Sequence, residues 1–175
     1  MVGAVPVVAF SGPSGAGKTR LLVRLVAELR ARGIRVAVVK HSGHPHGFDV
    51  PGKDSDLLFR AGAEGVAVQG ASQLACFMPP RPGGARALAR LLPAADVVLV
   101  EGWKEARLPR VEVHRREVSR DFACAGRSGY IAVVTDEPPP RPLPTFGPDD
   151  VAPLADLLCR RFRIAARGRR RGSSM

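Results

Sequence analysis

A complete phosphate-binding motif of the form G-x-x-x-x-G-K-[ST] stands near the start of the chain. Its residues are Gly12, Pro13, Ser14, Gly15, Ala16, Gly17, Lys18 and Thr19. The glycines allow the backbone to turn successive N–H groups toward a phosphate, and the lysine can reach the β- and γ-phosphates of a nucleotide. The threonine hydroxyl can ligate Mg²⁺. The motif therefore predicts binding of a nucleoside triphosphate together with magnesium.

The residues on either side of this motif supply the setting that it needs. An apolar run rich in β-branched residues, 5–10, predicts a strand that leads into the loop. An amphipathic stretch, 21–30, predicts a helix that leads out of it. The order of strand, glycine-rich loop and helix favours a phosphate site over a glycine turn that merely caps a helix.

A second group suited to phosphate chemistry is Glu101, which ends the apolar run 97–100. Proteins with this kind of loop use a carboxylate at a strand end to hold Mg²⁺ or to orient an attacking water. We expect Thr19 and Glu101 to hold the metal, and we take Lys18, Glu101 and Asp49 as the candidate catalytic residues. The alternative is a strand-end acid that simply reaches solvent.

The long loop after the predicted strand 34–40 is dense in polar and charged groups. Asp49 or Asp54 could complete the magnesium shell, and Lys53 could meet a phosphate. A loop of this kind can be ordered by the γ-phosphate and released on hydrolysis. The residues that we assign to this switch or substrate loop are His41, His44, Gly52, Lys53, Asp54 and Ser55.

Three of the four histidines of the chain, His41, His44 and His46, lie in the same loop. Imidazole is a good ligand for nickel, zinc or copper, so one interpretation is a transition-metal site. The other is that these side chains make ordinary polar contacts.

Thr135 and Asp136 follow the predicted strand 130–134. An aspartate there can accept hydrogen bonds from N1–H and the 2-amino group of guanine, which adenine lacks as a pair. Thr135 and Asp136 are therefore candidate base-contacting residues that would select GTP. An aspartate after a strand is also a common turn residue, and that interpretation stays open.

Strands and helices alternate along the chain. Further strands are predicted at 110–114, 65–69 and 72–78, with the last two forming a hairpin, and further helices begin near 54, 85 and 149. The pattern predicts an α/β, three-layer P-loop NTPase fold, with a mostly parallel sheet, helices on both faces and one antiparallel hairpin. In such sheets ligands bind at the carboxyl ends of the strands, which brings the phosphate loop, the histidine loop, Glu101 and Asp136 to one edge.

The chain has 175 residues and a net charge of +11, much of it in seven arginines after Asp156. We expect a nucleotide-binding domain at 1–158 and a basic, disordered tail at 159–175. The tail is either a solvated end or a polyanion-binding segment. Aromatic residues are not interleaved with its basic residues, which argues against nucleic acid as a partner. Three cysteines without metal-ligand spacing, and no apolar run long enough for a membrane, indicate a cytoplasmic protein.

Several short motifs occur together in a definite order. They are the phosphate loop, Val39-Lys40-His41-x-x-His44, Asp49-x-x-Gly52-Lys53-Asp54-Ser55 with Ala61-Gly62-Ala63, Glu101-Gly102-x-Lys104, and Val134-Thr135-Asp136. This set resembles the molybdopterin-guanine dinucleotide biosynthesis protein B family (MobB-type), from the first strand to about Asp136. The Gly-Lys-Asp-Ser element on a histidine-containing loop is its most specific part.

The resemblance implies a small homodimeric GTP-binding protein with weak GTPase activity, using GTP and Mg²⁺. It implies a role beside the molybdenum cofactor guanylyltransferase, which joins a GMP moiety to molybdopterin. In this picture Gly12 to Thr19 bind phosphates and metal, Asp49 to Ser55 form the switch or substrate loop, Glu101 lies on the magnesium side, and Thr135 and Asp136 face the base. The hairpin is a candidate dimer interface because an exposed strand edge is usually covered.

Other functions remain compatible with the residues. Arg115, Arg116, Arg120 and Arg127 could form a lid over an acceptor phosphate, as in a small-molecule or nucleotide kinase. The histidine loop could serve a metallochaperone-type GTPase. A non-catalytic scaffold with a nucleic-acid-binding tail is the third alternative.

Overall fold

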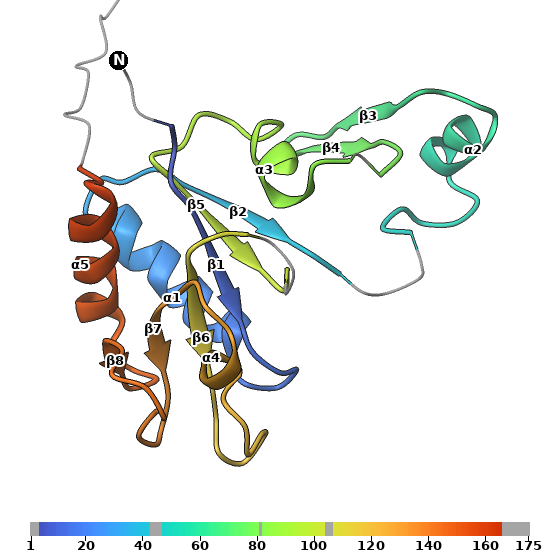
Figure 1. Ribbon diagram of the computed structural model, residues 1–175. Helices are drawn as coiled ribbons and strands as arrows, with labels where there is room; N and C mark the ends of the chain where they lie inside the picture. Colours follow the sequence, from blue (N-terminus) through green and yellow to red (C-terminus); the bar gives the residue numbers. More distant parts are fainter. Residues whose placement is uncertain (1–3, 43–46, 81, 104–106, 166–175) are drawn as a thin grey trace, which may run out of the picture. The chain divides into compact units, whose positions relative to one another are not determined.

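A computed structural model of the chain describes residues 4–42, 47–80, 82–103 and 107–165 (Figure 1). The chain divides into two compact units. The larger unit comprises Met1–His41 and Gly84–Met175, and the smaller unit is Ser42–Gly83. Among the described helices, none has the length and apolarity that crossing a bilayer would require.

The larger unit is built on a six-stranded sheet in the order β2-β5-β1-β6-β7-β8. All its neighbouring strands are parallel. The strands are β1 (Val7–Ser11), β2 (Val36–Lys40), β5 (Val97–Glu101), β6 (Arg110–Val113), β7 (Tyr130–Val134) and β8 (Thr145–Phe146). The continuous β-branched runs of β1, β5 and β7 fit strands that are covered on both faces.

One face of the sheet is covered by α1 (Lys18–Ala31) and α5 (Val151–Phe162), which pack against each other (Figure 1). Side chains alternate along each strand, so Val8 and Phe10 of β1 point to this face. They meet the apolar stripe of α1, which consists of Leu21, Leu22, Leu25 and Leu29. This is the larger of the two apolar cores.

The second core lies on the opposite face and uses the other side chains of the same strands. Val7 and Ala9 of β1 join Val98 and Val100 of β5 there. Helix α3 (Gly84–Ala89) covers this face with Ala85, and Trp103 packs at the margin. Because β1 is covered on both sides, its end, and the loop that follows it, have a fixed position.

The smaller unit consists of α2 (Asp54–Arg60) and the antiparallel pair β3 (Val66–Gln69) and β4 (Leu74–Phe77). The pairing register places Val66 opposite Phe77 and Gln69 opposite Leu74. Helix α2 begins at Asp54 after Lys53, and it has no buried residue.

The fold class predicted from the sequence is confirmed. Two elements had no clear signal: β8 lies inside a proline-rich stretch, and α4 (Ala123–Gly126) is only one turn long. Helix α5 continues to Phe162, so residues 159–162, predicted to belong to the tail, are helical; Cys159 and Phe162 pack against the core. Residues 166–175 lie outside the described part of the chain.

The packing of α1 on the sheet gives a stability prediction. Leu25 is fully buried, whereas Val23 on the same helix is 65% exposed. We expect Leu25→Ala to lower the free energy of unfolding by about 2–5 kcal/mol, because it leaves a cavity in the main core. Val23→Ala, the matched control, should change it by less than about 0.5 kcal/mol. Urea unfolding followed by circular dichroism measures both; equal effects would contradict this packing.

Candidate functional site

The phosphate loop connects β1 to α1, and three of its glycines have backbone angles that other residues rarely adopt. Their φ values are 152° at Gly12, 81° at Gly15 and 88° at Gly17. At Gly12 the constraint is also steric, since a Cβ atom would lie 2.1 Å from the carbonyl oxygen of Val113 in β6. The first glycine therefore lets the loop pack directly on the backbone of the neighbouring strand.

Lys18 is the first residue of α1, and its side chain folds back over the loop. Its Nζ donates hydrogen bonds to the carbonyl oxygens of Gly12 at 3.0 Å and Pro13 at 2.6 Å. These bonds hold the ammonium group at the loop and beside the N-terminus of α1, where phosphate is favoured.

The start of α1 and the end of β5 bring Thr19 and Glu101 together, although they are far apart in the sequence. The hydroxyl of Thr19 donates a 2.6 Å hydrogen bond to Oε1 of Glu101. Glu101 is buried, and Nζ of Lys40, at the end of β2, lies 3.7 Å from the same oxygen. A hydroxyl and a carboxylate oxygen are hard donors of the kind that Mg²⁺ takes, so these two residues fit the metal.

His41 follows β2 and is fixed by the same edge of the sheet. Its backbone N–H donates to the carbonyl oxygen of Glu101 at 2.9 Å, and its ring lies 4.8 Å from the ring of Trp103. His44 and His46 lie outside the described residues. Within the described part of the chain, no cluster of three metal-ligating side chains occurs.

The remaining residues of the predicted switch loop belong to the smaller unit. Oδ1 of Asp49 accepts hydrogen bonds from the N–H of Val50 and the hydroxyl of Ser55. The N–H of Gly52 donates a hydrogen bond to Oδ2 of Asp56. This bond, with a second from the side chain of Arg60, lowers the pKa of Asp56. Lys53 and Asp54 stand at the start of α2. Asp49 and Ser55 thus stabilise the turn before α2, and their catalytic and substrate-binding roles stay predictions.

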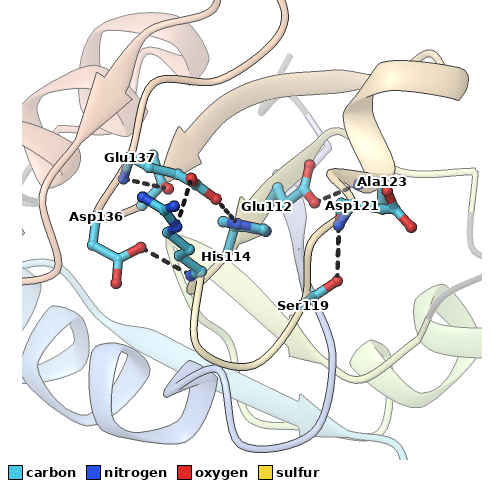
Figure 2. Close-up of polar contacts among 9 residues, drawn as sticks. Glu112, His114, Ser119, Asp121, Ala123, Asp136 and Glu137 are labelled. Carbon is cyan, nitrogen blue, oxygen red and sulfur yellow. Dashed lines mark hydrogen bonds and ion pairs between the residues drawn. The ribbon is translucent and has the colours of Figure 1, made fainter.

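At the end of β7 the predicted base-contacting residues are held by local bonds. The hydroxyl of Thr135, which is buried, accepts a hydrogen bond from the N–H of Glu137. Oδ1 of Asp136 accepts one from the N–H of Arg116 at 3.1 Å. Figure 2 shows Asp136 beside the loop that follows β6.

A buried polar cluster at β6 escaped the sequence analysis. The carboxylate of Glu112, almost fully buried, accepts hydrogen bonds from the N–H of Ala123 (Figure 2) and from the N–H of Cys124. Burial, with a contribution from this carboxylate, raises the pKa of the Cys124 thiol to about 12. The signal was available: Glu112 and His114 alternate with Val111 and Val113 in a strand that the fold buries on both faces.

His114 completes the cluster. Its ring is fully buried, stacks on Phe122 with centroids 3.7 Å apart, and places Nε2 2.7 Å from Oε1 of Glu137. Because an ionised carboxylate only accepts hydrogen bonds, Nε2 carries the proton in this pair. The pair ties the end of β6 to the end of β7.

A cavity of about 140 Å³ lies between the start of α1 and the ends of β6 and β7. It adjoins the second half of the phosphate loop, and it is large enough for part of a nucleotide rather than the whole. Its lining residues are Ala16, Gly17, Arg20, Leu21, Val113, His114, Arg115, Val134, Pro148 and Asp149.

Comparison with known proteins agrees with this arrangement. Residues 7–136 match the sequence profile of the family described as molybdopterin guanine dinucleotide synthesis protein B, or MobB. The chain belongs to the MobB family. The matched span runs from β1 to Asp136, and so includes the phosphate loop, Glu101, Glu112 and His114.

Individual MobB relatives cover much of the chain. A molybdopterin-guanine dinucleotide biosynthesis adapter protein of Haemophilus influenzae is 39% identical over 66% of this chain and 67% of its own. Its counterpart of the same description in Escherichia coli is 33% identical over 88% and 91%. The crystal structure of Bacillus subtilis MobB superposes with a TM-score of 0.68 at 26% identity, covering 89% of this chain and 96% of that one.

The contact between Gly12 and β6 yields a prediction for the phosphate loop. We expect Gly12→Ala to lower the free energy of unfolding by at least about 1–3 kcal/mol, because the new methyl group collides with the Val113 carbonyl. The control is Gly126→Ala, where a Cβ would meet nothing within 4 Å. Thermal unfolding compares the two, and an unchanged midpoint for Gly12→Ala would show that the loop does not pack on β6 in this way.

Proposed function

We propose that this MobB-family protein is a GTP-binding adapter in molybdenum cofactor biosynthesis, assisting the formation of molybdopterin guanine dinucleotide. The observation that carries the proposal is the hydrogen bond between Thr19 and Glu101, together with the ammonium group that Lys18 holds at the phosphate loop. It puts a phosphate loop, a cation and a buried acid at one sheet edge. The names of the relatives support the pathway.

In this proposal the chain binds the nucleotide chiefly by its backbone and two side chains. The N–H groups of the loop and the N-terminus of α1 bind the α- and β-phosphates, and Lys18 reaches the β- and γ-phosphates. Thr19 and Glu101 hold Mg²⁺, which when bound neutralises charge on the phosphates. Thr135 and Asp136 are proposed to contact guanine.

Hydrolysis is expected to be slow. Fast GTPases place a glutamine beside the γ-phosphate to orient the attacking water. The larger unit, which carries the phosphate loop, has no glutamine in its sequence; Gln69 and Gln73 belong to the smaller unit. Slow hydrolysis suits an adapter whose bound nucleotide matters more than its rate of turnover. We propose the molybdenum cofactor guanylyltransferase and molybdopterin as the partners of this protein.

We also propose that the protein is a homodimer that uses the smaller unit. An isolated two-stranded hairpin is marginally stable in water, so the exposed apolar face of the β3–β4 hairpin is a candidate surface for contact with a second copy of the chain. Large apolar side chains are exposed in this unit: Phe48, Val50, Leu57, Leu58, Val68, Leu74 and Met78.

Nucleotide titration tests the proposed activity. We expect purified protein to bind GTP with Mg²⁺ more tightly than ATP, and Lys18→Ala to weaken GTP binding at least about tenfold through loss of a charged phosphate contact. Asp136→Ala should reduce the difference in affinity between GTP and ATP, because it removes the proposed guanine contact. Arg30→Ala, which removes an exposed charge from α1, is the control and should bind normally. Tighter binding of ATP than of GTP would refute the GTP assignment.

Sedimentation velocity tests the dimer. Leu74 is 64% exposed on β4, and we expect Leu74→Asp to convert dimer to monomer by placing a charge in an apolar interface. Gln73→Asp, one residue earlier, introduces the same charge at an exposed polar position of the turn and should remain dimeric. A monomeric wild-type protein at micromolar concentration would rule out a stable homodimer.

A further inference from the structure

The segment between β6 and α4, residues 115–122, is anchored at both ends, and two of the anchoring side chains, Glu112 and His114, are buried. At its start, Asp136 binds the N–H of Arg116, and His114 is tied to Glu137. At its end, Phe122 stacks on His114, and Glu112 binds the first N–H groups of α4. Figure 2 shows Asp136, Glu137, His114 and Glu112 around this loop. These contacts hold both ends of the segment in place.

This segment lies against the phosphate loop. A Cβ built on Gly15 would be 3.9 Å from Cγ1 of Val118, which is ordinary van der Waals contact. Arg115 lines the same cavity as Ala16, Gly17 and Arg20. The anchored segment therefore places Arg115 beside the second half of the phosphate loop.

Arg115 is only weakly engaged by the protein itself. Its Nη1 donates to Oε1 of Glu117 at 2.9 Å, with side-chain exposures of 34% for the arginine and 70% for the glutamate. Exposed ion pairs of this kind contribute little to stability. A phosphate, which can accept two parallel hydrogen bonds from a guanidinium group, competes well with such a partner.

The position along the nucleotide follows from the parts of the loop that share the cavity. Backbone N–H groups of a phosphate loop cradle the α- and β-phosphates, whereas the lysine reaches toward the γ-phosphate. Arg115 shares its cavity with Ala16 and Gly17, while Thr19, at the start of α1, is hydrogen-bonded to Glu101 at the end of β5. The guanidinium is thus on the diphosphate side.

We propose that Arg115 is a phosphate-binding residue that contacts the α- and β-phosphates of the nucleotide held by the phosphate loop. The proposal rests on the nucleotide binding proposed above and adds a cation from a separate segment. Glu112, His114 and Glu137 act as positioning residues, since they hold the segment that presents Arg115. No group is transferred in this role; the arginine neutralises charge and orients the phosphate chain.

The test compares Arg115→Ala with Arg120→Ala, which removes an exposed arginine from the same segment. Affinities for GTP and GDP are measured by calorimetry with Mg²⁺, and inorganic pyrophosphate is used as a competitor. We expect Arg115→Ala to lower the affinities for GTP and for GDP by the same factor, about tenfold or more. It should lower the affinity for pyrophosphate, measured by competition, to a similar extent. Arg120→Ala should behave as wild type. Arg115→Lys keeps the charge but loses the paired N–H donors of the guanidinium group, so its affinities should lie between those of the wild type and of Arg115→Ala.

The possible outcomes separate this role from the proposed function. Normal binding of GTP and GDP by Arg115→Ala would overturn the role of Arg115 alone. A loss of affinity confined to GTP would place the contact at the γ-phosphate. Unchanged competition by pyrophosphate would place it at the nucleoside. Either result would overturn the assignment of Arg115 to the α- and β-phosphates. Wild-type protein that binds no nucleotide would overturn both proposals. An unchanged thermal midpoint for Arg115→Ala confirms that any loss is not unfolding.

Discussion

The burial of β1 on both faces is the constraint on which the candidate site depends. Val8 and Phe10 pack toward α1 and α5, while Val7 and Ala9 pack toward α3, so the strand can neither rotate nor slide without opening a core. Its parallel neighbours β5 and β6 are fixed by the same register. The phosphate loop, Glu101 and the end of β6 therefore meet at one edge through packing, and polar contacts only refine their positions.

The sequence was sufficient for those features that a local pattern encodes. The phosphate loop has a rigid motif, and the buried strands are runs of β-branched residues, so both could be predicted. Glu101 could be placed beside Thr19 because parallel strands bring their carboxyl ends to one edge. In each case the interaction between distant residues followed from the topology, and the topology followed from the alternation of strands and helices.

The parts that could not be predicted depend on contacts between distant segments with no pattern of their own. Strand β8 has two residues in a proline-rich stretch, and it forms because β7 offers it an edge. Helix α4 is a single turn whose first N–H groups bind Glu112, eleven or more residues away in the chain. The pairing of His114 with Glu137 likewise requires β6 and β7 to be neighbours, and neither residue belongs to a motif.

The packing of Gly12 on the carbonyl of Val113 has a thermodynamic consequence. With no side chain between them, the phosphate loop and the end of β6 form one continuous backbone contact, and β6 leads directly into His114 and the anchored segment. Two sites joined in this way share a coupling free energy, and such coupling is reciprocal. A ligand that orders the loop must therefore protect the β6–α4 segment from local opening, by the same factor that an ordered segment raises the affinity for that ligand.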